Sequence, residues 1–328
     1  MSADTADADG GAGPEREEVS RREAWLMAAR PQTLPAGAAP VVAGTGLAVN
    51  QGVFAPLPAL FALLGALLLQ VGTNFANDYY DAVKGADTED REGFTRVTAG
   101  GLIPAASVRR AMYLTYGAAV LVGVYLVYVG GLPIVVVGLS GIAAGILYTG
   151  GPYPYGYRGL GDLFVFVYFG LVAVTGTYYV QAVAAAPVGP FPLSVPPGTV
   201  PLAAVVASLP AAGLSTAILV VNNLRDRETD RRAGKRTLAV MLGYGLSRVE
   251  FALVVGMAYV VPVVFYATGF APFVLLPLLT VPLAIRLGRT VFTRTDGAAL
   301  NPALETTGKL LAAHSVLFAV GLALGRLL

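Results

Sequence analysis

Long apolar runs, separated by short connections, are the strongest constraint on how this chain can fold. A helix that spans a membrane needs about 20 mostly apolar residues. Nine segments approach or reach that length, with approximate cores at 33–49, 56–76, 108–129, 132–149, 161–185, 201–221, 247–268, 271–289 and 309–327. Charged residues make up 13% of the chain, about half the share found in soluble proteins. We therefore expect an all-α polytopic membrane protein with about nine transmembrane helices.

The charged residues are unevenly divided among the connections. Every second connection carries no charge of either sign, namely 50–55, 130–131, 186–200 and 269–270. The other connections carry nearly all of the 22 Lys and Arg residues. By the positive-inside rule, the N-terminus and the charged loops face the cytoplasm, and the C-terminus lies outside. We therefore expect a multi-pass protein of the cell membrane, with any site among the charged loops facing the cytoplasm.

The N-terminal residues 1–24 differ in composition from the remainder of the chain. They are polar, with little aromatic content, and lack the apolar centre of a signal peptide. We expect them to form a disordered tail, followed by a single transmembrane domain at 25–328.

The absence of cysteine limits the chemistry that is available. With no cysteine in the chain, disulfides, thiolate metal sites and a cysteine nucleophile are excluded. The single histidine, His314, lies in the last apolar segment, where a packing role is favoured over a ligand role. Any bound metal must then be held by oxygen, which favours a hard cation such as Mg²⁺.

Two similar polar motifs follow apolar segments at equivalent places. "NDYYDAVKG" begins at Asn77, after the second segment, and "NLRDRETD" follows Asn222, after the sixth. The spacing from Asn77 to Asp81 is repeated from Asn222 to Asp226, and four segments separate the two motifs. The repeated spacing suggests two four-helix repeats plus a ninth helix. Repeats in membrane proteins commonly share a site at their interface.

The second motif places three oxygen-bearing side chains at helical spacing. If the helix continues through it, Asn222, Asp226 and Asp230 at i, i+4 and i+8 share one face. Carboxylates one turn apart repel each other unless a cation lies between them. Two such faces that meet across a cavity would form an oxygen site for a divalent metal.

The first motif repeats this spacing incompletely. Asn77 and Asp81 match the first two positions, whereas Gly85 occupies the third, and Asp78 and Asp87 lie nearby. We include both of these aspartates among the candidate metal ligands.

Basic residues accompany both motifs, namely Lys84, Arg91 and Arg96 at the first, and Arg225, Lys235 and Arg236 at the second. Protein-bound Mg²⁺ usually has one or two carboxylate ligands together with substrate phosphates. Carboxylates, metal and basic side chains together indicate a diphosphate site. The adjoining apolar bundle suggests that the ligand also has a lipid tail. For any single arginine, a plain anchoring charge remains the alternative.

A third polar stretch, "YTGGPYPYGYRGLGD", runs from Tyr148 to Asp162 on the charged side. Its tyrosines form either an interfacial aromatic belt or a wall that stabilises a nearby cation. We take Tyr148 and Arg158 as candidate substrate-binding residues. Arg30, in "ARPQTLPA", is favoured as a simple anchor.

These four segments resemble the UbiA-type intramembrane aromatic prenyltransferases over nearly all of residues 25–328. The first motif, with Gly85 at its third position, is similar to the form of this motif in the branch of that family that uses 1,4-dihydroxy-2-naphthoate. The resemblance implies Mg²⁺ on a polyprenyl diphosphate, with Asp81, Asp226 and Asp230 as catalytic carboxylates. The implied metal ligands are Asn77, Asp78, Asp81, Asp87, Asn222, Asp226 and Asp230. The implied substrate contacts are Asn77, Asn222, Lys84, Arg96, Lys235 and Arg236.

The reaction implied by the resemblance is electrophilic substitution on the naphthoate ring. The prenyl group replaces the carboxylate, CO₂ and diphosphate leave, and demethylmenaquinone forms. Other acceptors of the family remain alternatives: 4-hydroxybenzoate, homogentisate, a chlorophyllide, haem or a glycerol phosphate ether. A secondary transporter is the alternative from another class. The expectation that all acidic residues lie outside the apolar cores, on one side, argues against it. The sequence indicates neither a protein partner nor nucleic-acid binding.

Overall fold

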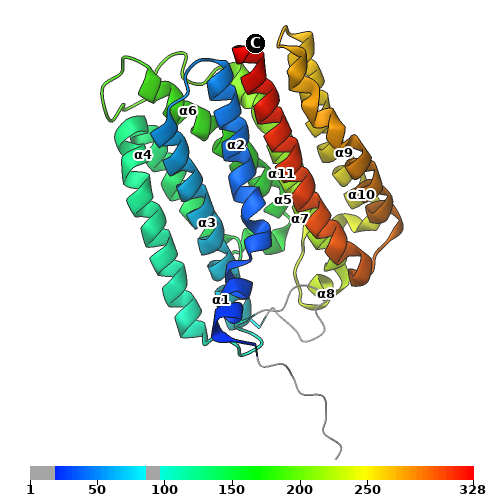
Figure 1. Ribbon diagram of the computed structural model, residues 1–328. Helices are drawn as coiled ribbons and strands as arrows, with labels where there is room; N and C mark the ends of the chain where they lie inside the picture. Colours follow the sequence, from blue (N-terminus) through cyan, green and yellow to red (C-terminus); the bar gives the residue numbers. More distant parts are fainter. Residues whose placement is uncertain (1–18, 86–96) are drawn as a thin grey trace, which may run out of the picture.

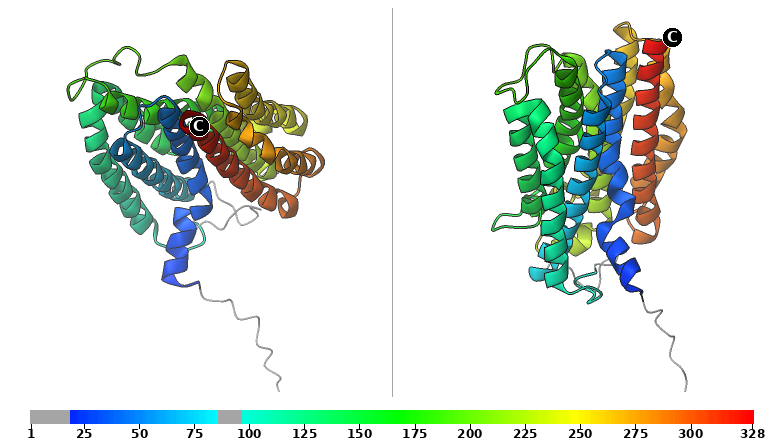
Figure 2. Two further views of the ribbon diagram at one scale, coloured as in Figure 1. Left: turned by 45° about the horizontal axis from the view of Figure 1, so that its top comes forward. Right: turned by 60° about the vertical axis from the view of Figure 1, so that its left-hand side comes forward.

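The computed structural model describes residues 19–85 and 97–328, which form helices and turns without any strand. Seven helical stretches in this part of the chain are long and apolar enough to cross a membrane. They are α3 (Pro56–Val83), α4 (Ala105–Leu147), Gly161–Ala185, α7 (Leu202–Arg225), α9 (Leu238–Ala267), Pro272–Thr293 and α11 (Gly297–Leu327). They run roughly along one common axis (Figures 1 and 2). The prediction of an all-α membrane protein is thus confirmed.

Two of these stretches are composite. Gly161–Ala185 contains α5 (Gly161–Val165), the π-helical η3 (Phe166–Val172) and α6 (Ala173–Ala185). Pro272–Thr293 contains the 3-10 helix η4 (Pro272–Thr280) and α10 (Val281–Thr293).

The 43 residues of α4 form two helices folded against each other. Gly131 has φ 65° and ψ −151°, a conformation that is open almost exclusively to glycine. A Cβ built on Gly145 would lie 2.6 Å from the hydroxyl of Tyr116, a contact that a straight helix could not make. The chain therefore turns back at Gly131, as the charge-free connection 130–131 predicted.

The helix α2 (Leu34–Asn50) completes the bundle. With 17 residues it is about 25 Å long, slightly short of a typical bilayer core. Counting α2 and both halves of α4, the described residues contain nine helical segments of about spanning length. Residue 19 and Leu328 lie at opposite ends of the bundle (Figure 1), as an odd number of crossings requires.

Small residues bring the helices of the core close together. A Cβ on Gly213 of α7 would overlap the carbonyl oxygen of Val254 in α9, and one on Gly46 of α2 would overlap Ala319 in α11. Such close approaches replace the hydrophobic driving force that membrane helices lack. As a result α7 lies in the centre of the bundle, which places the end of α7, with its acidic motif, inside the protein.

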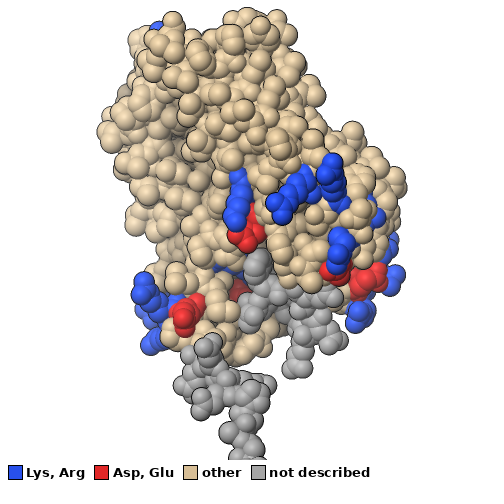
Figure 3. All heavy atoms as spheres, turned by 45° about the vertical axis from the view of Figure 1, so that its right-hand side comes forward, with Lys and Arg blue, Asp and Glu red and all other residues tan. Residues whose placement is uncertain are grey.

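The charged side chains gather toward the end of the molecule where α1 (Arg21–Ala29) and α8 (Arg227–Arg232) lie. Figure 3 shows this on one face, whose opposite end is almost free of charge. The helices α3 and α7 both reach this charged end with their acidic motifs.

Three details differ from the sequence expectation. The helix α1 begins at Arg21, inside the predicted tail, where the Ser20 side chain and Glu23 form a capping box; residues 1–18 lie outside the described part. The helix α9 begins at Leu238, nine residues before its predicted core, and is kinked at Gly243, which has φ 74° and ψ 175°. The expectation that every acidic residue lies outside the apolar segments is wrong for Glu250, which is half-buried within α9, and for Asp162, which is buried in α5.

Candidate active site

A cavity of about 1090 Å³ runs into the bundle from its charged end. Its polar part is lined by side chains of both acidic motifs, namely Asn77, Asp81, Asn222, Asp226 and Asp230. Further inside, the lining is largely apolar and comes mainly from α3, both halves of α4, η3 and α6. Polar groups at the mouth and an apolar interior suit a ligand with a charged head and a hydrocarbon tail.

The first motif belongs to the last two turns of α3, which continues past its predicted core to Val83. Asp81 is 2% exposed and accepts a hydrogen bond from the hydroxyl of Tyr157. The Asn77 amide oxygen accepts a hydrogen bond of 3.1 Å from Thr149 Oγ1. Both side chains are thereby held in position by the polar stretch that follows α4.

The second motif crosses a break between α7 and α8, yet it keeps its helical spacing. Asp226 lies between the two helices with φ −88° and ψ 2°. Its backbone N–H still donates to Asn222 O at 3.0 Å, and Asp230 N–H donates to Asp226 O at 2.8 Å. All three side chains therefore line the cavity, as the predicted common face requires.

Arg225 neutralises the central carboxylate of the second motif. Its Nε lies 2.7 Å from Asp226 Oδ1, and one terminal nitrogen lies 2.8 Å from Asp226 Oδ2. Further donations reach Asn222 Oδ1 at 2.8 Å and Asn301 Oδ1 at 3.0 Å. The two charged side chains of this pair are almost completely buried, so Arg225 orients Asp226 and, through Asn301, fastens the motif to α11.

Tyr157, on the short helix η2 (Tyr155–Arg158), connects the two motifs. Its hydroxyl donates to Asp81, and its ring centroid lies 4.8 Å from Lys235 Nζ. Its carbonyl oxygen accepts a hydrogen bond of 2.8 Å from the N–H of Arg236. Nothing in the sequence separated Tyr157 from its tyrosine neighbours, because its contacts depend on how the two halves of the bundle meet.

Two lysines differ in their relation to the cavity. Lys235 is 7% exposed and lines the cavity, and its Nζ lies 3.6 Å from Asp230 Oδ1. Lys84 follows α3 and donates to the carbonyl oxygens of Thr149 at 2.5 Å and Gly151 at 2.9 Å. Partial burial lowers the pKa of Lys84, while the Asp81 carboxylate opposes this shift. In this arrangement Lys84 stabilises the loop after α4 and does not line the cavity.

Tyr148 lies at the cavity wall. Burial raises the pKa of its phenol well above the usual value, and the nearby Asp162 carboxylate raises it further. The phenol therefore stays neutral over the physiological range and can donate a hydrogen bond.

Besides Lys84, the structure places three predicted site residues outside the cavity lining. Asp78 is buried, accepts hydrogen bonds from Thr98 and lies 3.9 Å from an Arg30 nitrogen. Arg158 is exposed and stacks on Tyr153 at 4.7 Å, and the Arg236 side chain is also exposed.

Two further predicted residues, Asp87 and Arg96, lie outside the described residues.

The oxygen donors fit a metal ion that is shared with a substrate. Within the described residues, no three acidic or histidine side chains come together closely enough to hold an ion by themselves. The predicted oxygen cage is therefore not formed by carboxylates alone. Mg²⁺ ordinarily takes one or two protein carboxylates and completes its shell with water and phosphate oxygens. Asp81, Asp226 and Asp230, with their neighbouring amides, supply that kind of partial ligand set.

Polar residues from other helices also line the cavity, although no motif marks them. On α3, about two turns and one turn before the first motif, the Gln70 and Asn74 amide nitrogens donate to Thr33 Oγ1 at 3.0 and 2.9 Å. Gln70 Oε1 is buried and has no hydrogen-bond partner within the described part of the chain. Arg30, predicted to be an anchor, also lines the cavity, and its φ of 53° is unusual for a residue other than glycine.

The helices and the cavity together define an integral membrane protein. Its cavity has acidic and basic side chains at the mouth and an apolar interior. Residues 38–324 match the UbiA prenyltransferase family. The chain belongs to this family of prenyltransferases, which confirms the resemblance seen in its motifs.

Individual relatives agree with this assignment. The chain is 39% identical to 1,4-dihydroxy-2-naphthoate octaprenyltransferase from Escherichia coli (strain K12), over 94% of this chain and 98% of that protein. It is also 39% identical to the protein of the same name from Mycobacterium tuberculosis (strain ATCC 25618 / H37Rv), over 92% and 98%. The fold is similar to that of a UbiA homolog from Archaeoglobus fulgidus bound to DMAPP and Mg²⁺, with a TM-score of 0.56 at 14% identity, covering 90% of this chain and 99% of that one.

Proposed function

We propose that this protein transfers a polyprenyl group from polyprenyl diphosphate to 1,4-dihydroxy-2-naphthoate in a Mg²⁺-dependent reaction. The observation that carries the proposal is the meeting of both Asn/Asp motifs at the mouth of one apolar cavity. Two relatives named as 1,4-dihydroxy-2-naphthoate octaprenyltransferases, each 39% identical over more than nine-tenths of the chain, support this acceptor.

The proposed reaction breaks one C–O bond and exchanges one C–C bond for another. The allylic C–O bond breaks, diphosphate departs, and a new C–C bond forms at the ring carbon that bears the carboxylate. The C–COO⁻ bond then breaks, CO₂ leaves, and its electron pair restores the aromatic ring. The direct product is demethylmenaquinol, the two-electron-reduced form of demethylmenaquinone.

The residues of the mouth have separate roles in this proposal. Asn77, Asp81, Asn222, Asp226 and Asp230 would hold Mg²⁺ on the diphosphate, and bound Mg²⁺ would offset the negative charge of the leaving group. The solved A. fulgidus relative, which binds DMAPP and Mg²⁺, supports this metal.

Basic and aromatic side chains act beside these ligands. Lys235 lines the cavity next to Asp230 and would stabilise the charge that develops on the departing diphosphate. Tyr157 and Arg225 position the carboxylates of Asp81 and Asp226. Tyr148, which stays neutral, would donate a hydrogen bond to the substrate.

The apolar part of the cavity would hold the prenyl chain and exclude water, which would otherwise capture the allylic cation. Val124 and Leu139, on the two halves of α4, both line the cavity and are 60% and 63% exposed. The cavity therefore reaches the outer surface of the bundle between the two halves of α4. A prenyl chain dissolved in the bilayer could enter there without crossing water.

Product analysis tests the activity directly. Purified protein would receive 1,4-dihydroxy-2-naphthoate, Mg²⁺ and a mixture of prenyl diphosphates, and mass spectrometry would identify the lipid product. We expect a prenylated naphthoquinol that has lost CO₂, no product after chelation, and recovery when Mg²⁺ is restored. Asp81→Asn should be inactive, whereas Asp296→Asn, at an exposed ion pair with Arg294, should retain activity.

Other outcomes would contradict defined parts of the proposal. Prenylation of 4-hydroxybenzoate or homogentisate in preference to the naphthoate would refute the acceptor. Substrate flux into proteoliposomes without diphosphate release would instead support transport.

We also propose that the repeats predicted from the two motifs form the two sides of this site, with the N-terminus and the mouth in the cytoplasm. Because the chain has no cysteine, single cysteines can report on sidedness. Ser194→Cys, in a charge-free connection, should react with an impermeant maleimide from outside intact cells. Thr295→Cys, between α10 and α11, should react only after permeabilisation, and the reverse pattern would overturn this orientation.

A further inference from the structure

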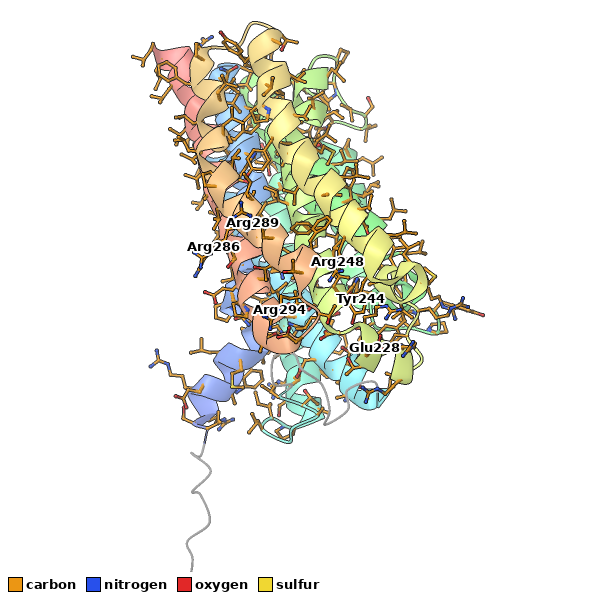
Figure 4. The ribbon with its side chains drawn as sticks, turned by 90° about the vertical axis from the view of Figure 1, so that its right-hand side faces the viewer. Glu228, Tyr244, Arg248, Arg286, Arg289 and Arg294 are labelled. Carbon is orange, nitrogen blue, oxygen red and sulfur yellow. The ribbon has the colours of Figure 1, made fainter. Side chains whose placement is uncertain are left out.

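Two arginines on α10 face outward within an apolar helix and lack a counter-charge. Arg286 and Arg289 are exposed and lie in Pro272–Thr293, which qualifies as a membrane span. At spacing i, i+3 they share one side of the helix. Among the described residues neither guanidinium has a hydrogen bond or ion pair. Figure 4 shows Arg286 pointing away from the bundle.

The neighbouring cations are already compensated. Arg294 pairs with Asp296 at 2.8 Å. Arg248, on α9, donates to the carbonyl oxygens of Val291 at 2.9 Å and Arg294 at 3.0 Å, at the C-terminal end of α10. Uncompensated charge therefore concentrates on Arg286 and Arg289.

A second group of arginines nearer the charged end is compensated in a similar way. Glu228 forms ion pairs with both Arg227 and Arg231, and Arg227 also stacks on Tyr244 at 4.7 Å. Figure 4 shows Glu228 closer to that end than Arg286 and Arg289. No acidic side chain of the described residues thus neutralises the pair on α10.

The surroundings of these arginines are hydrophobic. Ile285 and Phe292, on the same outer side of α10, are 51% and 45% exposed, while Ala284, Leu287 and Val291 on its other side are buried against the bundle. A ligand of this surface must therefore offer an anionic group to the arginines and hydrocarbon to their neighbours. A free phosphate satisfies only the first requirement.

We propose that Arg286 and Arg289 bind the phosphate of an anionic phospholipid, whose acyl chains lie along Ile285 and Phe292. Guanidinium groups donate paired hydrogen bonds to phosphate oxygens, a geometry that lysine cannot reproduce. Basic side chains near the membrane surface attract the head groups of anionic lipids. This lipid site lies on the outside of the bundle and is independent of the proposed prenyl transfer, because neither arginine lines the catalytic cavity.

Native mass spectrometry of the delipidated full-length protein tests the site. Phosphatidylglycerol and phosphatidylcholine of identical acyl chains would be titrated separately in neutral detergent. We expect one phosphatidylglycerol to bind in preference to phosphatidylcholine. Arg286→Gln with Arg289→Gln should weaken phosphatidylglycerol binding by at least about tenfold, since each lost hydrogen bond to a charged group contributes about that factor. Binding of phosphatidylcholine should not change.

A matched control removes the same charge elsewhere. Arg109→Gln with Arg110→Gln alters two exposed arginines at the start of α4, and phosphatidylglycerol binding should stay within about twofold of the wild type. An equal loss in this control would show that only bulk charge acts and would overturn the site. Displacement of the lipid by an equal concentration of inorganic phosphate would overturn the lipid assignment.

A further variant separates binding from folding. Arg286→Lys with Arg289→Lys keeps both charges but loses the planar, two-pronged donor geometry. We expect its affinity for phosphatidylglycerol to lie between those of the wild type and the glutamine variant, with an unchanged melting temperature in phosphatidylcholine. Wild-type affinity in the glutamine variant would refute the proposal.

Discussion

Removal of a single hydroxyl group, in Tyr157→Phe, tests how the two halves of the site are held together. The phenylalanine ring would keep its place below Lys235, whose Nζ lies 4.8 Å from the ring centroid, and near Lys84 at 5.7 Å. The lost interaction is the hydrogen bond that Tyr157 donates to the Asp81 carboxylate. The substitution therefore tests only how the orientation of Asp81, a proposed metal ligand, affects the reaction.

The size of the effect can be worked out from this contact. A hydrogen bond to a charged group contributes about 1.5–3 kcal/mol, which corresponds to about a 10- to 150-fold change in an equilibrium or rate constant at about 1.4 kcal/mol per tenfold. Loss of a partner that orients a metal ligand typically costs about 10- to 100-fold in metal affinity or activity. We therefore expect prenyl transfer to fall about 10- to 100-fold, and the Mg²⁺ concentration for half-maximal rate to rise.

Initial rates of prenylated naphthoquinol formation, measured across a Mg²⁺ titration, provide the assay. Tyr153→Phe is the matched control, because this tyrosine lies in the same stretch, is 70% exposed and contacts Arg158 through its ring. The control should behave as the wild type. If Tyr157→Phe also kept the wild-type rate and Mg²⁺ dependence, the hydrogen bond to Asp81 would not position a metal ligand, and the reasoning would fail.

Three further predictions concern substitutions elsewhere in the protein. Asp81→Ala or Asp226→Ala should abolish prenyl transfer while the protein still inserts into the membrane, as fractionation and product analysis would show. Arg225→Met removes the buried ion pair between Arg225 and Asp226 and should destabilise the protein by about 3–5 kcal/mol; adding Asp226→Leu should restore much of the melting temperature but no activity. Gly131→Ala should cost about 3 kcal/mol, because its Cβ would overlap Pro192 at a backbone conformation that suits glycine; a thermal melt like that of the wild type would contradict this turn.

The helices could be predicted from the sequence because a bilayer demands long apolar segments. The turn at Gly131 was predictable for the same reason, since a run from 108 to 149 is too long for one crossing and its middle carries two glycines. The ends of the helices were harder to predict from the sequence. The helix α9 starts at Leu238 because Thr237 caps it by accepting from the N–H of Val240, a local interaction that hydropathy does not record.

The site was predictable only where one chain segment contains its pattern. Asn222, Asp226 and Asp230 could be placed on one face because backbone hydrogen bonds preserve the helical spacing across the break at Asp226. Asp78 belongs to the first motif, but its carboxylate contacts Thr98 and Arg30 instead of lining the cavity. The spacing of residues in the sequence could not predict these contacts.

Compensation of charge explains why this acidic mouth is stable before any substrate arrives. Buried carboxylates in an apolar bundle are costly unless they are paired or hydrogen-bonded. In the structure Asp81 has the Tyr157 hydroxyl, Asp226 has the Arg225 guanidinium, and Asp230 lies near the Lys235 ammonium. Each partner satisfies only part of its carboxylate, since an ionised carboxylate can accept about four hydrogen bonds. The same contacts that stabilise the fold can therefore also orient these carboxylates toward a metal ion and the diphosphate that it accompanies.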